Sequence, residues 1–375
     1  MKLHRMPLLI KEIIVEELGF GERLFLSFTS KRTCSLVKLF RNEPSGFISI
    51  TIDINNSELS VCVRKPHLSE PIPVKIRSRA INKLEFRIPY EQGYVKDSSA
   101  WIIDGSTVQA EKYSSAIYCS LNDERFGLDK NRNAVIVFGK LLRHLNSVLN
   151  IQECRECKYF MRLPVGLFRQ LDCSYSYGRI ETQTGYIANT SPEDLTFLLD
   201  HIKANHIILN VAVTSAPGYK YRKNPEKKRS IDVLKVAHYS WVDFSNLPAA
   251  RVISILIEIP LNQMRTILVY WIAGRNREME IGFFRMDELT DQDREALFSG
   301  IKTQDTQLTG AEIRSFIVST KDIHKMRFPS STVAVDVVRK SDGMRATVIE
   351  GDKRNMRVYH CSPGSYLNMS PSYTS

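Results

Sequence analysis

The sequence lacks an apolar run long enough to cross a bilayer, which takes about 20 mostly apolar residues in succession. The longest candidate, residues 252–272, is interrupted by charged side chains at Glu258 and Arg265. The apolar run near the start of the chain is broken at Lys11 and Glu12, so we expect no secretory signal. We therefore expect an intracellular protein, in the cytoplasm, the nucleus or both, without membrane contact.

Cysteine is sparse, with seven residues scattered over 375, and the odd number argues against a disulfide framework. Only Cys154 and Cys157 have metal-like spacing. A structural zinc needs four ligands, and the chain offers no second such pair. Cys173 and His144 are the other conceivable ligands. We favour free thiols, and we expect neither a metal nor another cofactor.

Sequence motifs of catalysis are missing as well. The chain has no GxxxxGK[ST] phosphate loop, no GxSxG elbow, no HExxH and no GxGxxG after a strand. None of its eight histidines stands in a context that pairs a base with a nucleophile. We expect a protein that is not an enzyme. An enzyme of an unrecognised class remains an alternative, because catalytic groups can be assembled in space.

Positive charge is in excess, with 52 Lys and Arg against 41 Asp and Glu, a formal net charge of +11. The most conspicuous basic segment is residues 219–229, which combines cations with tyrosines. It could be a nuclear-import signal or a nucleic-acid contact, or a solvated insertion. We favour the insertion, so nucleic acid is an unlikely partner, although a basic nucleic-acid-binding module stays the alternative function.

Residues 6–40 carry more apolar side chains than three short helices can bury. Ile10, Ile14 and Leu18 recur every four residues, which is one face of a helix. A second helix is expected up to Ser30, which would cap a third helix to about residue 40. So small a unit has little interior. The surplus apolar surface either packs on the rest of the chain or meets another protein.

A β-rich segment follows from residue 44. Its expected strands are residues 47–54, 59–65, 73–77, 83–88 and about 116–120. The first two should form a hairpin, and residues 89–130 otherwise have the pattern of loops.

From residue 134 the pattern alternates between helices and strands. We expect strands at 134–139, 206–213, 254–259 and 279–286, and helices at 138–149, 192–202 and 264–272. Each helix has one apolar face and needs a neighbour to cover it, which favours a stacked α/β solenoid. A single open α/β sheet remains possible.

The C-terminal part contains two helix-capping patterns and a hairpin. Thr290 with Asp293 and Thr309 with Glu312 could each begin a helix. Residues 331–351 should form a hairpin that turns at Ser341-Asp342-Gly343. We expect the polar tail, residues 362–375, to be disordered.

Two sets of motifs resemble a known family. Met6-Pro7-Leu8-Leu9 followed by a helix, and then Ser-Phe-Thr-Ser-Lys-Arg at 27–32, resemble the F-box of the large nematode F-box family. Residues 241–274, ending in Tyr-Trp-Ile-Ala-Gly, the strand from 279 and the segment 339–343 are similar to that family's F-box-associated domain. The resemblance covers roughly residues 4–41 and 200–350.

The resemblance implies an α+β or α/β architecture in four parts. These are an F-box-like three-helix domain (1–43), a β-rich segment (44–133), an irregular leucine-rich-repeat-like α/β domain (134–361) and the tail (362–375).

The resemblance also implies a function without chemistry. Such proteins are substrate-recognition subunits of SCF-type cullin–RING ubiquitin ligases. The F-box would bind a Skp-family adaptor, and through it a cullin, while the C-terminal domain would bind a protein target that the sequence does not name. Besides the nucleic-acid-binding module, the alternative is another protein-interaction module without a ligase role. The adaptor contacts expected from their motif position and apolar character are Pro7, Leu8, Leu9, Ile13, Leu24 and Leu36.

Overall fold

The structure is a computed structural model of the 375-residue chain with mixed α and β content. It describes residues 5–18, 20–40, 48–54, 58–64, 83–89, 99–113, 116–120, 130–149, 151–159, 166–171, 173–182, 187–226, 230–286, 289–306, 334–350 and 355–361. The chain divides into two compact units. Unit 1 is Met1–His206 with Val213–Ala216, and unit 2 is Ile207–Ala212 with Pro217–Ser375.

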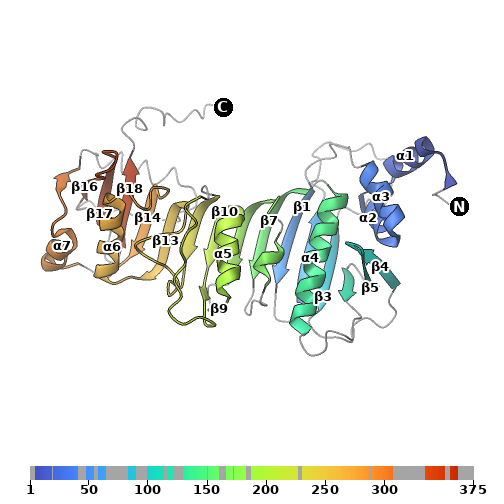
Figure 1. Ribbon diagram of the computed structural model, residues 1–375, viewed down its shortest axis with the longest axis horizontal. Helices are drawn as coiled ribbons and strands as arrows, with labels where there is room; N and C mark the ends of the chain where they lie inside the picture. The colour runs from blue at the N-terminus through green and yellow to red at the C-terminus, as the bar shows by residue number, and fades with distance from the viewer. Residues whose placement is uncertain are drawn as a thin grey trace, which may run out of the picture. The chain divides into compact units, whose positions relative to one another are not determined.

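Three helices begin the described chain, six strands follow them, and from α4 onward single helices are separated by one or more strands (Figure 1). The helices are α1 Leu8–Glu17, α2 Phe20–Thr29, α3 Lys31–Leu39, α4 Lys130–Val148, the 3-10 helix η3 Phe168–Gln170, α5 Pro192–His201, α6 Leu261–Ile272 and α7 Asp291–Phe298. The strands are β1 Ile48–Ile54, β2 Glu58–Arg64, β3 Lys83–Pro89, β4 Ser99–Ile103, β5 Ser106–Tyr113, β6 Ala116–Ser120, β7 Ile151–Tyr159, β8 Ser176–Thr182, β9 Ala188–Asn189, β10 Lys203–Leu209, β11 Val211–Ala212, β12 Ile231–Val236, β13 Ala250–Glu258, β14 Ile281–Arg285, β15 Thr303–Asp305, β16 Ala334–Val338, β17 Arg345–Glu350 and β18 Asn355–Cys361.

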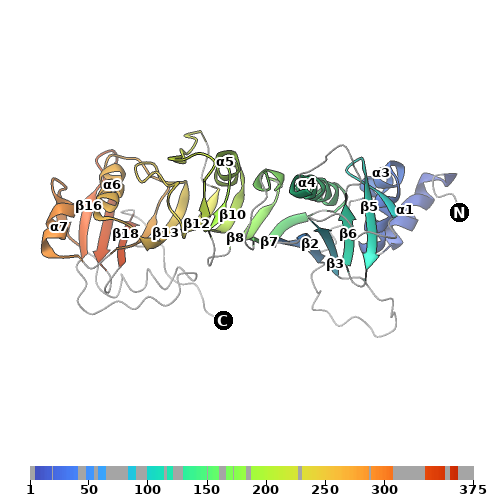
Figure 2. The ribbon, with the colours of Figure 1, turned by 90° about the horizontal axis from the view of Figure 1, so that it is seen from below.

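Unit 1 is built on a mixed sheet with the strand order β8-β7-β1-β2-β3-β6-β5-β4. The predicted β1–β2 hairpin is confirmed, with Ile52 opposite Val61, and β1 also pairs in parallel with β7. Helix α4 contacts β2, β3, β4 and β6 and lies along one face of the sheet (Figure 2). Its apolar side buries Phe138, Leu141 and Leu145 completely. The hydrophobic core of unit 1 therefore lies between α4 and this sheet.

The prediction of a strand at residues 134–139 is wrong, because this segment is part of α4. A short apolar run has the same composition in a buried strand and in a buried helix, so periodicity alone does not separate them. Here Ala134 continues the buried stripe of Phe138, Leu141 and Leu145 at helical spacing. The helix thus begins at Lys130, one turn before the apolar run.

Residues 99–113 were expected to be loop but form the β4–β5 hairpin. Its two-residue turn is Asp104-Gly105, and both residues have positive φ, 46° and 75°. This backbone suits the right-handed twist of a hairpin, and Asp-Gly is one of the few dipeptides that tolerate it. The hairpin places Trp101 against α2, where its ring lies 4.8 Å from that of Phe28.

Unit 2 contains a second run of strands, in the order β15-β16-β17-β18-β14-β13-β12. Strands β12, β13 and β14 are parallel. Beyond them the sheet is antiparallel, because β14 pairs with β18, β18 with β17, and β17 with β16. Helix α6 buries Met264, Ile267, Leu268 and Trp271. Gly274 follows with φ +85°, and this confirms it as the C-terminal stop.

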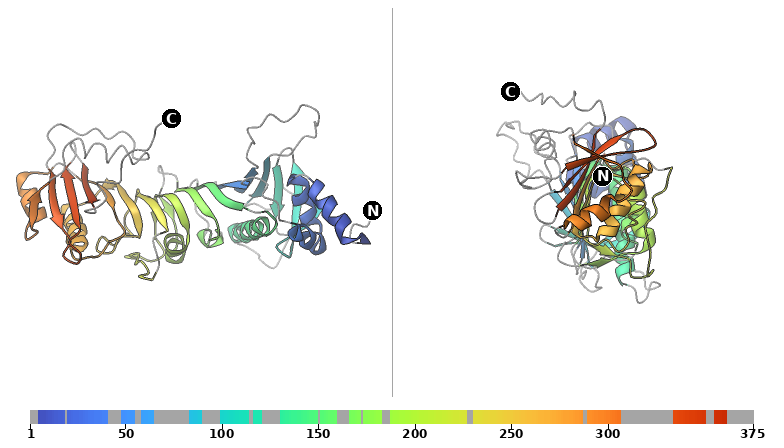
Figure 3. Two further views of the ribbon diagram at one scale, coloured as in Figure 1. Left: turned by 90° about the horizontal axis from the view of Figure 1, so that it is seen from above. Right: turned by 90° about the vertical axis from the view of Figure 1, so that its left-hand side faces the viewer.

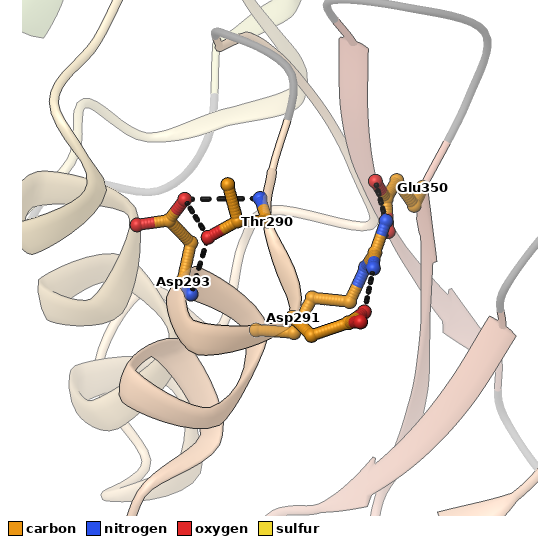
Figure 4. Close-up of polar contacts among 5 residues, drawn as sticks. Thr290, Asp291, Asp293 and Glu350 are labelled. Carbon is orange, nitrogen blue, oxygen red and sulfur yellow. Dashed lines mark hydrogen bonds and ion pairs between the residues drawn. The ribbon is translucent and has the colours of Figure 1, made fainter.

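Helix α7 begins at the predicted cap, and Figure 4 shows the contacts that hold it. The Thr290 side chain accepts from the Asp293 N–H, while the Asp293 carboxylate accepts from the Thr290 N–H and O–H. Arg294 donates two hydrogen bonds to the Glu350 carboxylate on β17, at 2.8 and 3.0 Å. Figure 3 shows α6 and α7 beside the strands of this unit. The capping box fixes where α7 starts, and Arg294 joins it to the sheet.

Several further expectations are confirmed. Ser30 and Ser191 cap α3 and α5 through their side chains. The β16–β17 hairpin turns through Gly343, with φ +70°. Segments 73–77, 309–312 and 362–375 lie outside the described residues.

Among the described elements an α-helix is followed directly by a strand five times, and three of these units lie between residues 130 and 286, as α4–β7, α5–β10 and α6–β14. That these units form a leucine-rich-repeat-like array, and that residues 1–43 are an F-box, stay predictions. So does the four-part domain division, although the first two parts and α4 all lie in unit 1.

Candidate protein-docking surface on the N-terminal helices

Helix α1 exposes four large aliphatic side chains, Leu8, Leu9, Ile10 and Ile13. Their exposed fractions are 58%, 65%, 41% and 47%. We call these four residues the α1 apolar face. Only Val15 of this helix is buried. Single exposed leucines are common on proteins, but four within two turns of one helix mark a surface that another molecule can cover.

The end of α1 is held by one arginine from α2. The Arg23 guanidinium donates to the Leu18 carbonyl at 2.9 Å and to the Glu16 carbonyl at 2.7 Å. The last carbonyls of a helix have no partner within the helix, and a cation there also meets the negative end of the helix dipole. The C-terminal end of α1 is therefore fixed to α2, while its apolar face stays open.

The six predicted adaptor contacts fall into two groups. Pro7, Leu8, Leu9 and Ile13 are exposed and lie together at the start of the chain. Leu24 and Leu36 are buried, with exposed fractions of 1% and 8%. Contact of the six residues with an adaptor stays a prediction, and in this structure the side chains of Leu24 and Leu36 do not reach the surface.

Leu24 and Leu36 are buried on α2 and α3, which contact each other and α4, and α2 also contacts β4. These contacts form an interface of α2 and α3 with the rest of unit 1. At its centre is Phe28, which is 1% exposed. Its ring stacks on Trp101 and on His144, at centroid distances of 4.8 and 4.7 Å, and meets Phe86 edge-on at 5.8 Å. Buried aromatic clusters contribute much of a core's stability. The inner side of α2 thus covers part of the hydrophobic core of unit 1.

A buried hydrogen-bond chain runs through the same interface. The Asp104 N–H donates to Nδ1 of His144, 3.2 Å away, so Nδ1 carries no proton. The Nε2–H therefore donates to Ser27 Oγ at 2.9 Å, and the Ser27 hydroxyl donates to the Leu24 carbonyl at 2.7 Å. Burial, with the charge of Lys38 nearby, lowers the pKa of His144 to about 4. The ring is neutral near pH 7 and connects α2, α4 and the β4–β5 turn.

The surplus apolar surface of residues 6–40 is partly covered by the chain itself. The inner faces of α2 and α3 pack on unit 1, as an internal cap would. The α1 apolar face has no such cover among the residues that the structure describes. The first alternative drawn from the sequence therefore holds for α2 and α3, whereas contact of α1 with another protein stays a prediction.

Cys154 and Cys157 lie within strand β7, and both are buried. The Cys157 thiol donates to Tyr159 Oη at 3.1 Å, and burial raises its pKa to about 12. His144, a conceivable fourth ligand, uses both ring nitrogens elsewhere, and Cys173 is exposed. Within the described ranges, no three His, Cys, Asp or Glu side chains are placed to hold a metal ion.

The basic segment at 219–229 is packed onto unit 2 as far as it is described, which is to residue 226. Tyr221 is buried, and its N–H donates to the Trp241 carbonyl. Lys220 donates to the Ser240 carbonyl at 2.8 Å, and Lys223 forms an ion pair with Glu278 at 2.7 Å. Two of its cations thus have partners within the unit, which favours a structural role.

Two exposed aliphatic residues of the N-terminal helices and one aromatic residue lie outside the set of contacts predicted from the sequence. Ile10 extends the α1 apolar face, and Leu39 at the end of α3 is 57% exposed. Trp101 lies in the β4–β5 hairpin, which the dipeptide Asp104-Gly105 could have predicted from the sequence.

No protein-family model, curated protein or solved structure matches this chain. In the part of the chain that the structure covers, no helix is both long and apolar enough to span a membrane.

Proposed function

We propose that this protein is a substrate-recognition subunit of an SCF-type ubiquitin ligase, in which the α1 apolar face binds a Skp-family adaptor. The observation that carries the proposal is the open row of Leu8, Leu9, Ile10 and Ile13 within a segment that resembles an F-box. The protein performs no chemistry in this role. It raises the effective concentration of a bound target near the ligase.

The α1 apolar face is too small to be a complete protein interface, but it is large enough to anchor one. Burying an exposed Leu or Ile side chain contributes about 1.5–3 kcal/mol. Because the four side chains are already about half covered, their further burial contributes on the order of 3–6 kcal/mol. Association must also offset the loss of rotational and translational freedom. A stable complex therefore needs further contacts beside α1.

The proposal is tested by co-expression with a Skp-family adaptor and co-purification. We expect the unmodified chain to retain the adaptor and Leu9→Asp or Ile13→Asp to lose it, because each places a carboxylate in the apolar contact. Both side chains are exposed, so both variants should fold.

Val269→Asp is the matched control, since Val269 is also an exposed aliphatic residue on a helix, at 39%, but lies on α6 in unit 2. It should retain the adaptor. Failure of the folded, unmodified chain to bind any Skp-family adaptor would reject the proposal, and so would retention by both α1 variants.

A nucleic-acid-binding module is the second candidate, and the charge of +11 is the observation that favours it. It predicts RNA or DNA binding that weakens steeply as the salt concentration rises. The packing of Lys220 and Lys223 within unit 2 argues against the 219–226 segment as its site.

A further inference from the structure

The outer side of α3 is basic and open. Lys31, Arg32 and Lys38 are all exposed, and we call these three residues the α3 basic face. Lys31 and Lys38 lie on the side of α3 away from the buried Leu36 and Val37, and Arg32 flanks Leu36. None of the three forms an ion pair with another described residue, in contrast to Lys223 with Glu278 in unit 2.

The charges of the N-terminal helices are also separated along the chain. Residues 12–22 contain four glutamates and no cation, whereas residues 23–40 contain four cations and no carboxylate. Residues 23–40 therefore contain no carboxylate that could neutralise the positive charge of α3. Asp104 of the β4–β5 turn acts on the pKa values of Cys34 and His144 together with Lys38, and its carboxylate accepts a hydrogen bond from Arg143. The α3 basic face acts over about 10 Å at ordinary ionic strength and raises the encounter rate with a surface of opposite sign.

On this basis we infer that the α3 basic face is the electrostatic half of the partner interface and meets an acidic surface on the same protein that covers the α1 apolar face. The inference rests on the proposed function and adds the chemistry of the partner: an apolar groove beside an acidic patch. Helices α1, α2 and α3 lie together at one end of unit 1 in two perpendicular views (Figures 1 and 2). The inference requires that one partner reaches both faces.

The other anionic partners fit the observations less well. A nucleic acid would satisfy the cations but offers no aliphatic surface to cover Leu9 and Ile13. An anionic membrane could take up both, but the exposed stripe of α1 continues into Glu16 and Glu17, which such a membrane would repel. A protein surface can carry an apolar centre and charges of both signs.

The test is the rate of association with a purified Skp-family adaptor, measured with the full chain at several salt concentrations. The variant Lys31→Glu/Arg32→Glu/Lys38→Glu should lower the association rate constant about tenfold or more at low salt, while the dissociation rate changes less than about threefold. The difference should nearly vanish at about 1 M salt, where screening acts within about 3 Å.

The matched control reverses three exposed lysines elsewhere, Lys203→Glu/Lys302→Glu/Lys340→Glu. Both variants change the net charge by the same amount, so a slow rate in the α3 variant alone assigns the effect to α3. Replacing the same three α3 residues by Gln should give a smaller effect in the same direction. Thermal unfolding checks that each variant is folded.

The outcomes separate this inference from the proposed function. If Leu9→Asp abolishes binding but the α3 variant associates as fast as its control, the inference is wrong and the proposed function stands. If the unmodified chain binds no adaptor, both are wrong. If the α3 variant loses only the binding of single-stranded RNA or of phosphatidylserine vesicles, the cations serve another anion and the inference is overturned.

Discussion

At the scale of single residues, His144 shows how a polar group can fix one helix onto a hydrophobic core. Its ring stacks on Phe28, and its two nitrogens are bonded to Ser27 and to the Asp104 N–H. Protonation would place a hydrogen on Nδ1, which could then no longer accept the hydrogen bond from the Asp104 N–H. The neutral form is therefore the form that the fold requires.

The stability of unit 1 should consequently depend on pH. The pKa of His144 is about 4 in the folded protein and about 6.5 when unfolded, so the unfolded chain binds more protons between these values. Its contribution is fully present above about pH 6.5 and is lost as the pH falls toward 4. Between about pH 7.5 and pH 5 the loss should be about 2 kcal/mol.

Urea unfolding of the full chain at these two pH values measures this contribution, and His144→Gln is the comparison. The variant should be less stable at neutral pH but should lose less stability on acidification. An equal pH dependence in the two proteins would show that His144 is not the group responsible.

At the scale of elements, α1 is the least embedded of the N-terminal helices, and Arg23 is the contact that holds its end. Removing the side chain in Arg23→Ala leaves the Glu16 and Leu18 carbonyls without their guanidinium donor. A hydrogen bond to a charged group contributes about 1.5–3 kcal/mol when buried, and less here because the site is partly exposed.

Hydrogen exchange followed by mass spectrometry should therefore show about tenfold faster exchange in α1 of Arg23→Ala, with α2 and α3 little changed. Lys31→Ala serves as the control, since it removes a cation that makes no ion pair in the described structure. If the exchange rates of α1 are equal in both variants, Arg23 does not stabilise the helix.

At the scale of the whole molecule, each of the two units has its own hydrophobic core. Phe28 lies in the core of unit 1, and Trp271 lies in that of unit 2, each 1% exposed or less. We expect calorimetry to show two unfolding transitions, because separate cores need not melt together. Phe28→Ala should lower the midpoint temperature of one transition and Trp271→Ala that of the other. Each should reduce the free energy of unfolding of its own unit by about 3–5 kcal/mol. A single transition that moves with either variant would contradict this.

The sequence by itself determined much of the local structure. Serine and threonine caps at Ser30, Ser191 and Thr290 located three helix starts, because a side-chain oxygen there satisfies backbone N–H groups that the helix leaves open. The Asp-Gly turn of the β4–β5 hairpin was equally local, and it could have been predicted from its two residues.

Which apolar side chains are exposed follows from the packing of distant segments and could not be predicted from the sequence. Leu9 and Leu24 have the same chemistry and both lie in apolar helical patterns, yet one is 65% exposed and the other 1%. Helix α2 contacts α3, and it also contacts α4 and β4, which lie about 70 residues or more away in the chain. The same holds for residues 134–139, since an apolar run records that a segment is buried but not which neighbours bury it. Burial depends on contacts between distant segments, and no local pattern contains them.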